Sequence, residues 1–300
     1  MYFSKKSFLP VAMSALLSIS LTACFHDDDD DDHDHVHGGD ITLTLDADEV
    51  VSGALDTGET ATATLLVHED DEELTGSVMF TGSSTVTALH LHSGYAGQTG
   101  GAVITFEQDA TNDMMWNIPS DSTTGDTAGD LDLATLQAGG YYLNAHYANG
   151  TLRAQVITED HIEIRVAALM PHTDVTTSGA GFAGVTINTE TNDVIAHVTI
   201  NELDDLTSAL NTDTGDDGVH LHITDADNTD DSSKFNLLAA GTATTGKETY
   251  SYDSTASVDN AGLAGNDRAN IALNQWYINV HTVDNLPGEL RADFTAITNP

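Results

Sequence analysis

The stretch YYLNAH at residues 141–146 occurs a second time as WYINVH at residues 276–281. Each stretch is followed by a turn and a second run, GTLRAQV at 150–156 and GELRADF at 288–294. Each is also preceded by the same short motif, HLH at 90–92 and at 220–222. Because three motifs recur in the same order, the sequence predicts two copies of one domain, with a boundary near residues 157–160.

The segments between these motifs alternate apolar and polar residues. Examples are ITLTL at 41–45, TATLLV at 62–67 and AHVTI at 196–200. Such period-two runs, rich in Val, Ile and Thr, are typical of half-buried β-strands. Frequent turn signals such as Asn149-Gly150 and Pro287-Gly288 separate them. The sequence therefore predicts an all-β protein of sandwich or barrel type, with short helical turns at 131–136 and 203–210.

At the repeated motifs the chain resembles the CHRD family, first noted in chordin. The segment INVHT at 278–282 with PGELR at 287–291 is similar to the family's ending, and HLHSG at 90–94 is similar to its His-x-His strand. The resemblance implies two tandem immunoglobulin-like β-sandwich domains, at 41–157 and 161–297, and no settled activity. The first copy has Asn149-Gly150-Thr151 in place of Pro-Gly-Glu, and the second follows His222 with Ile-Thr-Asp.

The N-terminus has the pattern of a targeting segment. Lys5 and Lys6 precede a mostly apolar run, which is shorter than a membrane span requires. The segment ends in LTAC at 21–24, which resembles a bacterial lipobox. We therefore expect residues 1–23 to be a lipoprotein signal peptide and Cys24, the only cysteine, to be lipidated. The alternative is a cleaved signal that leaves a free thiol. The resemblance implies the outer membrane, because Phe25 replaces the Asp of retained lipoproteins.

Residues 24–40 contain six consecutive aspartates, at 27–32, followed by HDHVHGGD. A block of like charges cannot bury a core, so this segment is expected to be a disordered, solvated tether. Its histidines also favour metal capture, and the two roles are compatible.

The formal net charge is −40, and removal of the predicted signal peptide takes away two lysines and lowers it to −42. Such a surface repels nucleic acid, which is excluded as a partner, and anionic lipid headgroups. Metal cations are natural partners, but adaptation to a salty medium is the explanation that we favour for most of the acids. Asp-rich segments at 213–217 and 225–231 raise calcium as a weaker candidate, without the spacing of an EF-hand loop.

The histidines form the sharpest candidate site. Residues i and i+2 of a strand share a face, so the two histidines of each His-x-His motif point the same way. A third imidazole can come from the Asn-x-His motif. Three imidazoles suit copper or zinc and leave one position open. The alternative is structural, with each imidazole hydrogen-bonded to a neighbouring Asn or a loop carbonyl. The candidates are His90, His92, His146, His220, His222 and His281.

Arg153 and Arg291 are two of the six basic residues that follow Cys24. We expect each to bridge strand carbonyls or an acid such as Glu289, and anion binding is the alternative. The chain has no Gly-x-Ser-x-Gly, His-Glu-x-x-His, Walker or Rossmann motif, so no catalytic residue is assigned. The sequence favours a cell-envelope binding or structural module, with an envelope or matrix protein as partner. The alternative is a copper or zinc protein, with superoxide-dismutase-like redox activity as one form of it.

Overall fold

The computed structural model describes residues 40–55, 58–68, 73–119, 131–203, 218–223, 233–239, 247–255, 276–282, 285 and 287–297. The predicted signal peptide, Cys24 and the tether up to residue 39 lie outside these residues. So do the Asp-rich segments at 213–217 and 225–231, and nearly all of the helical turn expected at 203–210.

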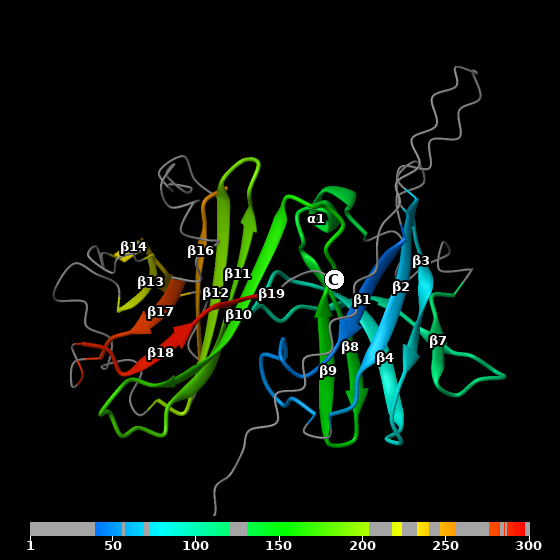
Figure 1. The fold of residues 1–300 in the computed structure, drawn as a ribbon, viewed down its shortest axis with the longest axis horizontal. Helices are drawn as coiled ribbons and strands as arrows, with labels where there is room; N and C mark the ends of the chain where they lie inside the picture. Colours follow the sequence, from blue (N-terminus) through cyan, green and yellow to red (C-terminus); the bar gives the residue numbers. More distant parts are fainter. Residues whose placement is uncertain are drawn as a thin grey trace, which may run out of the picture. The chain divides into compact units, whose positions relative to one another are not determined.

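The described part of the chain is almost entirely β-structure, as the alternating runs predict (Figure 1). Within it, no helix is long and apolar enough to span a membrane. The single described helix, α1 (Leu133–Gln137), overlaps the helical turn predicted at 131–136. Its N-cap is Asp132, whose side chain accepts a hydrogen bond from the backbone N–H of Thr135.

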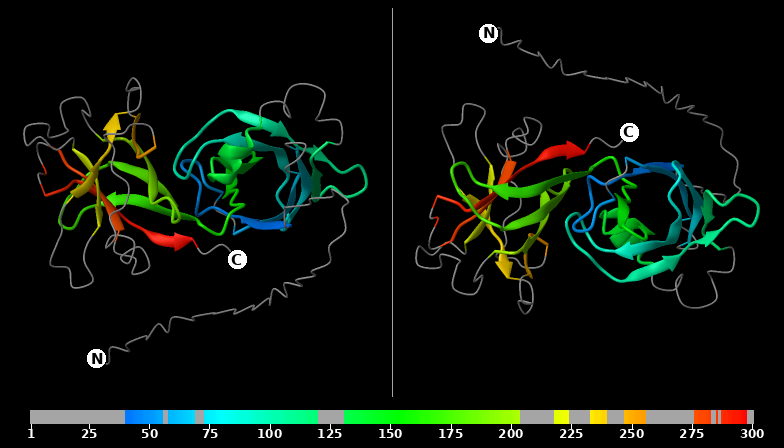
Figure 2. Two further views of the ribbon diagram at one scale, coloured as in Figure 1. Left: turned by 90° about the horizontal axis from the view of Figure 1, so that it is seen from above. Right: turned by 90° about the horizontal axis from the view of Figure 1, so that it is seen from below.

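Copy 1 consists of two antiparallel sheets. One sheet has the order β1-β2-β3-β7-β6 and the other β5-β4-β8-β9. Figure 2 shows these strands facing one another around a common interior. The strands are β1 (Ile41–Leu45), β2 (Ala61–His68), β3 (Glu73–Phe80), β4 (Val86–Ser93), β5 (Ala102–Thr105), β6 (Glu107–Gln108), β7 (Met115–Asn117), β8 (Tyr141–Tyr147) and β9 (Gly150–Gln155).

Copy 2 repeats this strand order. Its strands run β10-β11-β12-β16-β15 and β14-β13-β17-β18, and β10 also pairs with β18, which joins the two halves into one sheet. In copy 1 the matching contact is only the isolated bridge between Asp46 and Arg153. The strands are β10 (Ile162–Pro171), β11 (Ala180–Asn188), β12 (Asp193–Asn201), β13 (Val219–Ile223), β14 (Ser233–Asn236), β15 (Leu238–Ala239), β16 (Lys247–Asp253), β17 (Trp276–Val280), β18 (Leu290–Asp293) and β19 (Thr295–Ile297).

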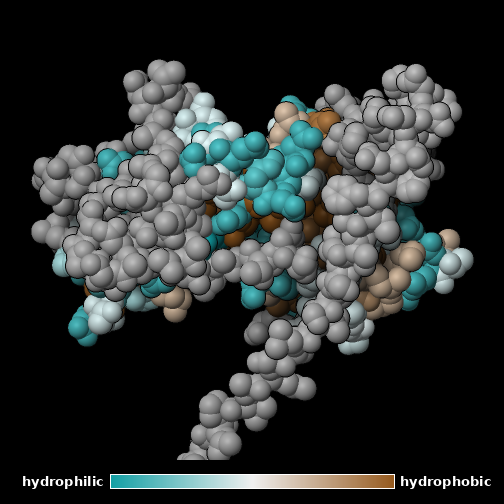
Figure 3. Space-filling model, turned by 45° about the horizontal axis from the view of Figure 1, so that its top comes forward, coloured by the Kyte–Doolittle hydropathy of each residue, from teal (hydrophilic) through white to brown (hydrophobic). Residues whose placement is uncertain are grey.

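Each copy buries its own apolar faces. In copy 1, Leu65, Leu89 and Leu143 are fully buried among the inward-facing residues of both sheets. In copy 2, Val219, Ile278 and Leu290 are fully buried in the same way. Figure 3 shows hydrophilic residues in front of hydrophobic ones on the described part of one face. The alternation of the strands therefore produces a separate β-sandwich core in each copy.

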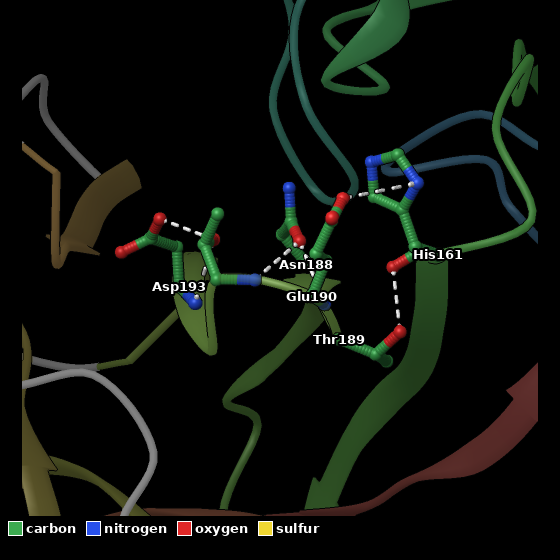
Figure 4. Close-up of polar contacts among 6 residues, drawn as sticks. His161, Asn188, Thr189, Glu190 and Asp193 are labelled. Atoms are coloured by element: carbon green, nitrogen blue, oxygen red, sulfur yellow. Dashed lines mark hydrogen bonds and ion pairs between the residues drawn. The ribbon is translucent and has the colours of Figure 1, made fainter.

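Polar contacts hold the turn between β11 and β12 in copy 2 (Figure 4). The side-chain oxygen of Asn188 accepts hydrogen bonds from the backbone N–H groups of Glu190 and Thr191, each at 2.9 Å. The Thr189 hydroxyl donates to the carbonyl of His161 at 3.0 Å, and the His161 ring lies 4.0 Å from the Glu190 carboxylate. These contacts include His161, a histidine outside the predicted site.

Candidate metal centre

The first histidine cluster lies on two neighbouring strands of copy 1. His90 and His92 are on β4 and His146 is on β8. The antiparallel register places His90 opposite Asn144 and His92 opposite Tyr142. The three imidazoles offer one nitrogen each within 4.8 Å of one another. Two nitrogens that each lie about 2.0–2.1 Å from one ion are at most about 4.2 Å apart, so nitrogens near the upper limit of this spacing would have to move closer together to share an ion.

The second cluster repeats this arrangement in copy 2. His220 and His222 are on β13, opposite Asn279 and Tyr277 of β17, and His281 follows directly after β17. These three residues also offer nitrogens within 4.8 Å of one another. The two copies therefore place the same residue types at the same register positions.

Burial keeps the imidazoles of the first cluster neutral. The pKa of His90, of His92 and of His146 is lowered in each case, first by burial. For His90 and His92, neighbouring positive charge lowers the pKa further, although the bond between His92 and the Gly100 carbonyl opposes the shift. A metal ion needs the neutral imidazole, so these residues are ready to bind at neutral pH.

Two nitrogens of the first cluster lack protein partners. Nδ1 of His92 lies 3.0 Å from the carbonyl of Gly100 and donates to it, which leaves the lone pair on Nε2. Among the described residues, this buried Nε2 and the buried Nδ1 of His90 have no hydrogen-bond partner. A ligand histidine commonly donates its other ring N–H to a backbone carbonyl, so His92 is oriented as a metal ligand would be.

The third histidine of each cluster also contacts an asparagine. Nε2 of His146 lies 3.3 Å from Nδ2 of Asn144, and Nε2 of His281 lies 3.2 Å from Nδ2 of Asn279. The amide of Asn279 is held in this orientation because it also donates to the Pro287 carbonyl at 3.0 Å. An ion held at Nε2 of His281 would replace this contact. The structure thus combines both expectations from the sequence, convergence of the imidazoles and hydrogen bonds to Asn and a loop carbonyl.

Each cluster is backed by a stack of a tyrosine and an arginine. The rings of His92 and Tyr142 are stacked with centroids 5.1 Å apart, and the Arg153 guanidinium lies 3.6 Å from the Tyr142 centroid. In copy 2 the rings of His222 and Tyr277 are 4.6 Å apart. The Arg291 guanidinium lies 3.5 Å from the Tyr277 centroid. These are cation–π contacts behind the candidate ligands.

Arg153 bridges two carbonyls, but they belong to the loop after β4 and not to a strand as the sequence predicts. It is 3% exposed and donates to the carbonyls of Gln98, at 2.7 Å, and Tyr95, at 3.2 Å. It also donates to the Gln155 side chain at 2.8 Å. Arg291 instead binds an acid, but the acid is Asp293, at 2.7 and 2.9 Å, and not Glu289. Glu289 accepts from the side chains of Thr282 and Asn285.

The tyrosines, Gln155 and Asp293 are the residues that sequence reasoning missed. A usable signal exists, because Tyr142 and Tyr277 lie four residues before the third histidine and so share its strand face. Gln155 and Asp293 likewise share a face with the arginine two positions earlier.

Comparison with known proteins gives one result. The sequence model of the CHRD domain matches residues 41–156 and 165–294, which together make up most of the chain. No curated protein and no solved structure matches it.

Proposed function

The chain belongs to the CHRD domain family, and on that premise we propose that each of its two domains binds one copper or zinc ion through three histidines. The observation that carries the proposal is the recurrence of the three-imidazole cluster, with the same register, in both copies. A single cluster is compatible with a structural role. Two copies with the same three residues, neighbouring Asn and stacked Tyr are better explained by a shared ligand.

The donor set indicates the class of metal. Imidazole suits copper and zinc, whereas calcium and magnesium prefer oxygen ligands. Three imidazoles leave one coordination position for water or another ligand. The buried, unpartnered nitrogens of His90 and His92 support the proposal further, because an unpaired buried polar atom costs about 1–3 kcal/mol and an ion removes that cost.

Metal content of the full chain tests this proposal. We expect copper or zinc to bind at two sites in addition to any on the His/Asp tether. The double variant H90A/H92A should lose one of these sites, and H220A/H222A should lose the other. The matched control H161A/H172A removes two histidines outside the clusters and should keep both. Equal metal content in all four proteins would overturn the proposal and leave a binding module without a metal.

The proposal places this metal protein at the cell envelope, held by a lipid on Cys24. The support is the LTAC sequence at 21–24 behind an apolar run. Labelled palmitate should be incorporated into the chain when it is expressed in a Gram-negative host, and C24S should abolish the label. Equal labelling of C24S would remove the lipid anchor without affecting the metal sites.

A further inference from the structure

The two arginine stacks differ in how the positive charge is compensated. In copy 1, Arg153 donates to two carbonyls and to the neutral amide of Gln155. Among the described residues, no carboxylate lies within 4.0 Å of its guanidinium. In copy 2, Arg291 donates twice to the Asp293 carboxylate. Gln155 and Asp293 occupy the same position of the repeat, two residues after the arginine.

The two arginines also differ in burial. Arg153 is 3% exposed, whereas the Arg291 side chain is 33% exposed and its partner Asp293 is 71% exposed. An acid in the neighbourhood of Arg153 is Glu49, which accepts a hydrogen bond from the backbone N–H of Gln155 at 2.7 Å. Burial raises the pKa of Glu49 to about 7, so below that pH it is mostly neutral and compensates Arg153 little.

We propose that Gln155 and Asp293 set the charge preference of the two metal sites, with copy 1 favouring monovalent copper and copy 2 favouring a divalent ion. The inference rests on the proposed metal binding. It assigns a specificity-determining position that touches neither the ion nor the histidines and acts through the arginine.

The physical basis is Coulomb repulsion. All three candidate ligands of each site are imidazoles, and in each copy a cationic arginine lies behind the tyrosine that stacks on one of them. A cation repels Cu²⁺ twice as strongly as Cu⁺ at the same distance. Below pH 7, where Glu49 is mostly neutral, the Arg153 charge therefore lowers affinity for Cu²⁺ more than affinity for Cu⁺. Asp293 cancels much of this repulsion at the second site.

The experiment measures the ratio of Cu²⁺ affinity to Cu⁺ affinity at one site at a time. H220A/H222A leaves only site 1 and H90A/H92A leaves only site 2, and the chain with all four substitutions corrects for the tether. Cu⁺ is prepared with ascorbate and titrated against bicinchoninate, and Cu²⁺ is titrated against nitrilotriacetate. We expect the ratio at site 2 to exceed that at site 1 roughly tenfold, which corresponds to about 59 mV for a one-electron couple.

Two substitutions at the exposed position of copy 2 should act in opposite directions. D293N removes the compensating charge and should lower the ratio at site 2 about threefold, whereas R291Q removes the cation and should raise it. A merely structural role would move both variants the same way. In copy 1, Q155D should raise the ratio, and the D293N/R291Q pair keeps the test decisive if Q155D fails to fold.

The outcomes separate the two proposals. Opposite shifts for D293N and R291Q support the inference. Copper binding at both sites with equal ratios, or with shifts of the same sign, overturns the inference and leaves the proposed function standing. A chain that binds no copper at either cluster overturns both.

Discussion

Copy 1 and copy 2 have the same strand order and the same histidine register, yet they support the arginine behind the histidines in different ways. In copy 1 the arginine is buried and donates to the carbonyls of Tyr95 and Gln98. The Gln155 side chain donates to the carbonyls of Gly94 and Gly139. In copy 2 the arginine is partly exposed and pairs with Asp293 on its own strand.

The residue two positions after the arginine, Gln155 or Asp293, therefore has a different role in each copy. An amide has donors and an acceptor, so Gln155 can tie together two loops and the arginine. A carboxylate only accepts, so Asp293 serves the arginine alone. We therefore expect copy 1 to depend on its arginine for stability much more than copy 2 does.

The largest expected effect is that of R153A. It removes the Arg153 donors from the half-buried carbonyls of Gln98 and Tyr95 and from the Gln155 oxygen, although the Tyr95 carbonyl keeps its bond from the Gln98 N–H. The free energy of unfolding of copy 1 should fall by about 3 kcal/mol. The matched R291A should cost copy 2 less than about 1 kcal/mol, because its ion pair is partly exposed. Hydrogen exchange in increasing urea, read from peptides of each copy, measures both. Equal losses would show that the two arginines have the same role.

The next effect depends on pH and belongs to copy 1. The pKa of Glu49 is raised by burial to about 7, above its usual 4.5. A carboxyl with a raised pKa favours the folded state below pH 4.5, and this contribution is lost as the pH rises through 7. E49Q should therefore match the parent near pH 4.5 and be more stable at pH 8, by on the order of 2 kcal/mol.

Stability against urea, measured from pH 4.5 to 8 on both proteins, isolates this group. The histidines of copy 1 have lowered pKa values and oppose the trend, but they are common to both proteins. A difference between E49Q and the parent that does not change with pH would contradict the raised pKa.

A smaller effect concerns loss of metal from the proposed sites. His90, His92 and His146 are partly exposed, whereas His220 and His222 are 4% and 8% exposed. EDTA should strip site 1 several-fold faster than site 2, a barrier difference of about 1 kcal/mol. Stopped-flow release from the two single-site proteins measures it, and faster release from site 2 would contradict the difference in burial.

Much of the fold follows from local sequence. The alternating runs at 41–45, 62–67 and 196–200 lie within β1, β2 and β12, as the period of two predicts. The repeat of three motifs correctly predicted two all-β CHRD copies. The immunoglobulin-like label and the exact domain boundaries remain predictions. So do the signal peptide, lipidation of Cys24 and the tether.

The histidine clusters were predictable because a shared strand face is a local property, and the third histidine comes from the adjacent motif. Metal binding at them remains a prediction. The spacing of the tyrosine and the third histidine signals that they share a strand face, but the stack with the arginine also depends on which strands pair and on which partner the arginine binds. Arg291 lies two residues from both Glu289 and Asp293, so sequence spacing alone could not select Asp293.

The smallest expected effect is a difference in stability between substitutions of two tyrosines on the same strand, β8. The hydroxyl of Tyr142 accepts a hydrogen bond from the backbone N–H of Gly100 at 3.1 Å, next to the carbonyl that holds His92. Y142F leaves this N–H without its partner and should cost copy 1 about 1 kcal/mol. Y147F is the control, because the buried hydroxyl of Tyr147 has no hydrogen-bond partner among the described residues. Its removal should cost nothing measurable, so equal losses in urea would show that the Gly100 bond does not hold the loop beside His92.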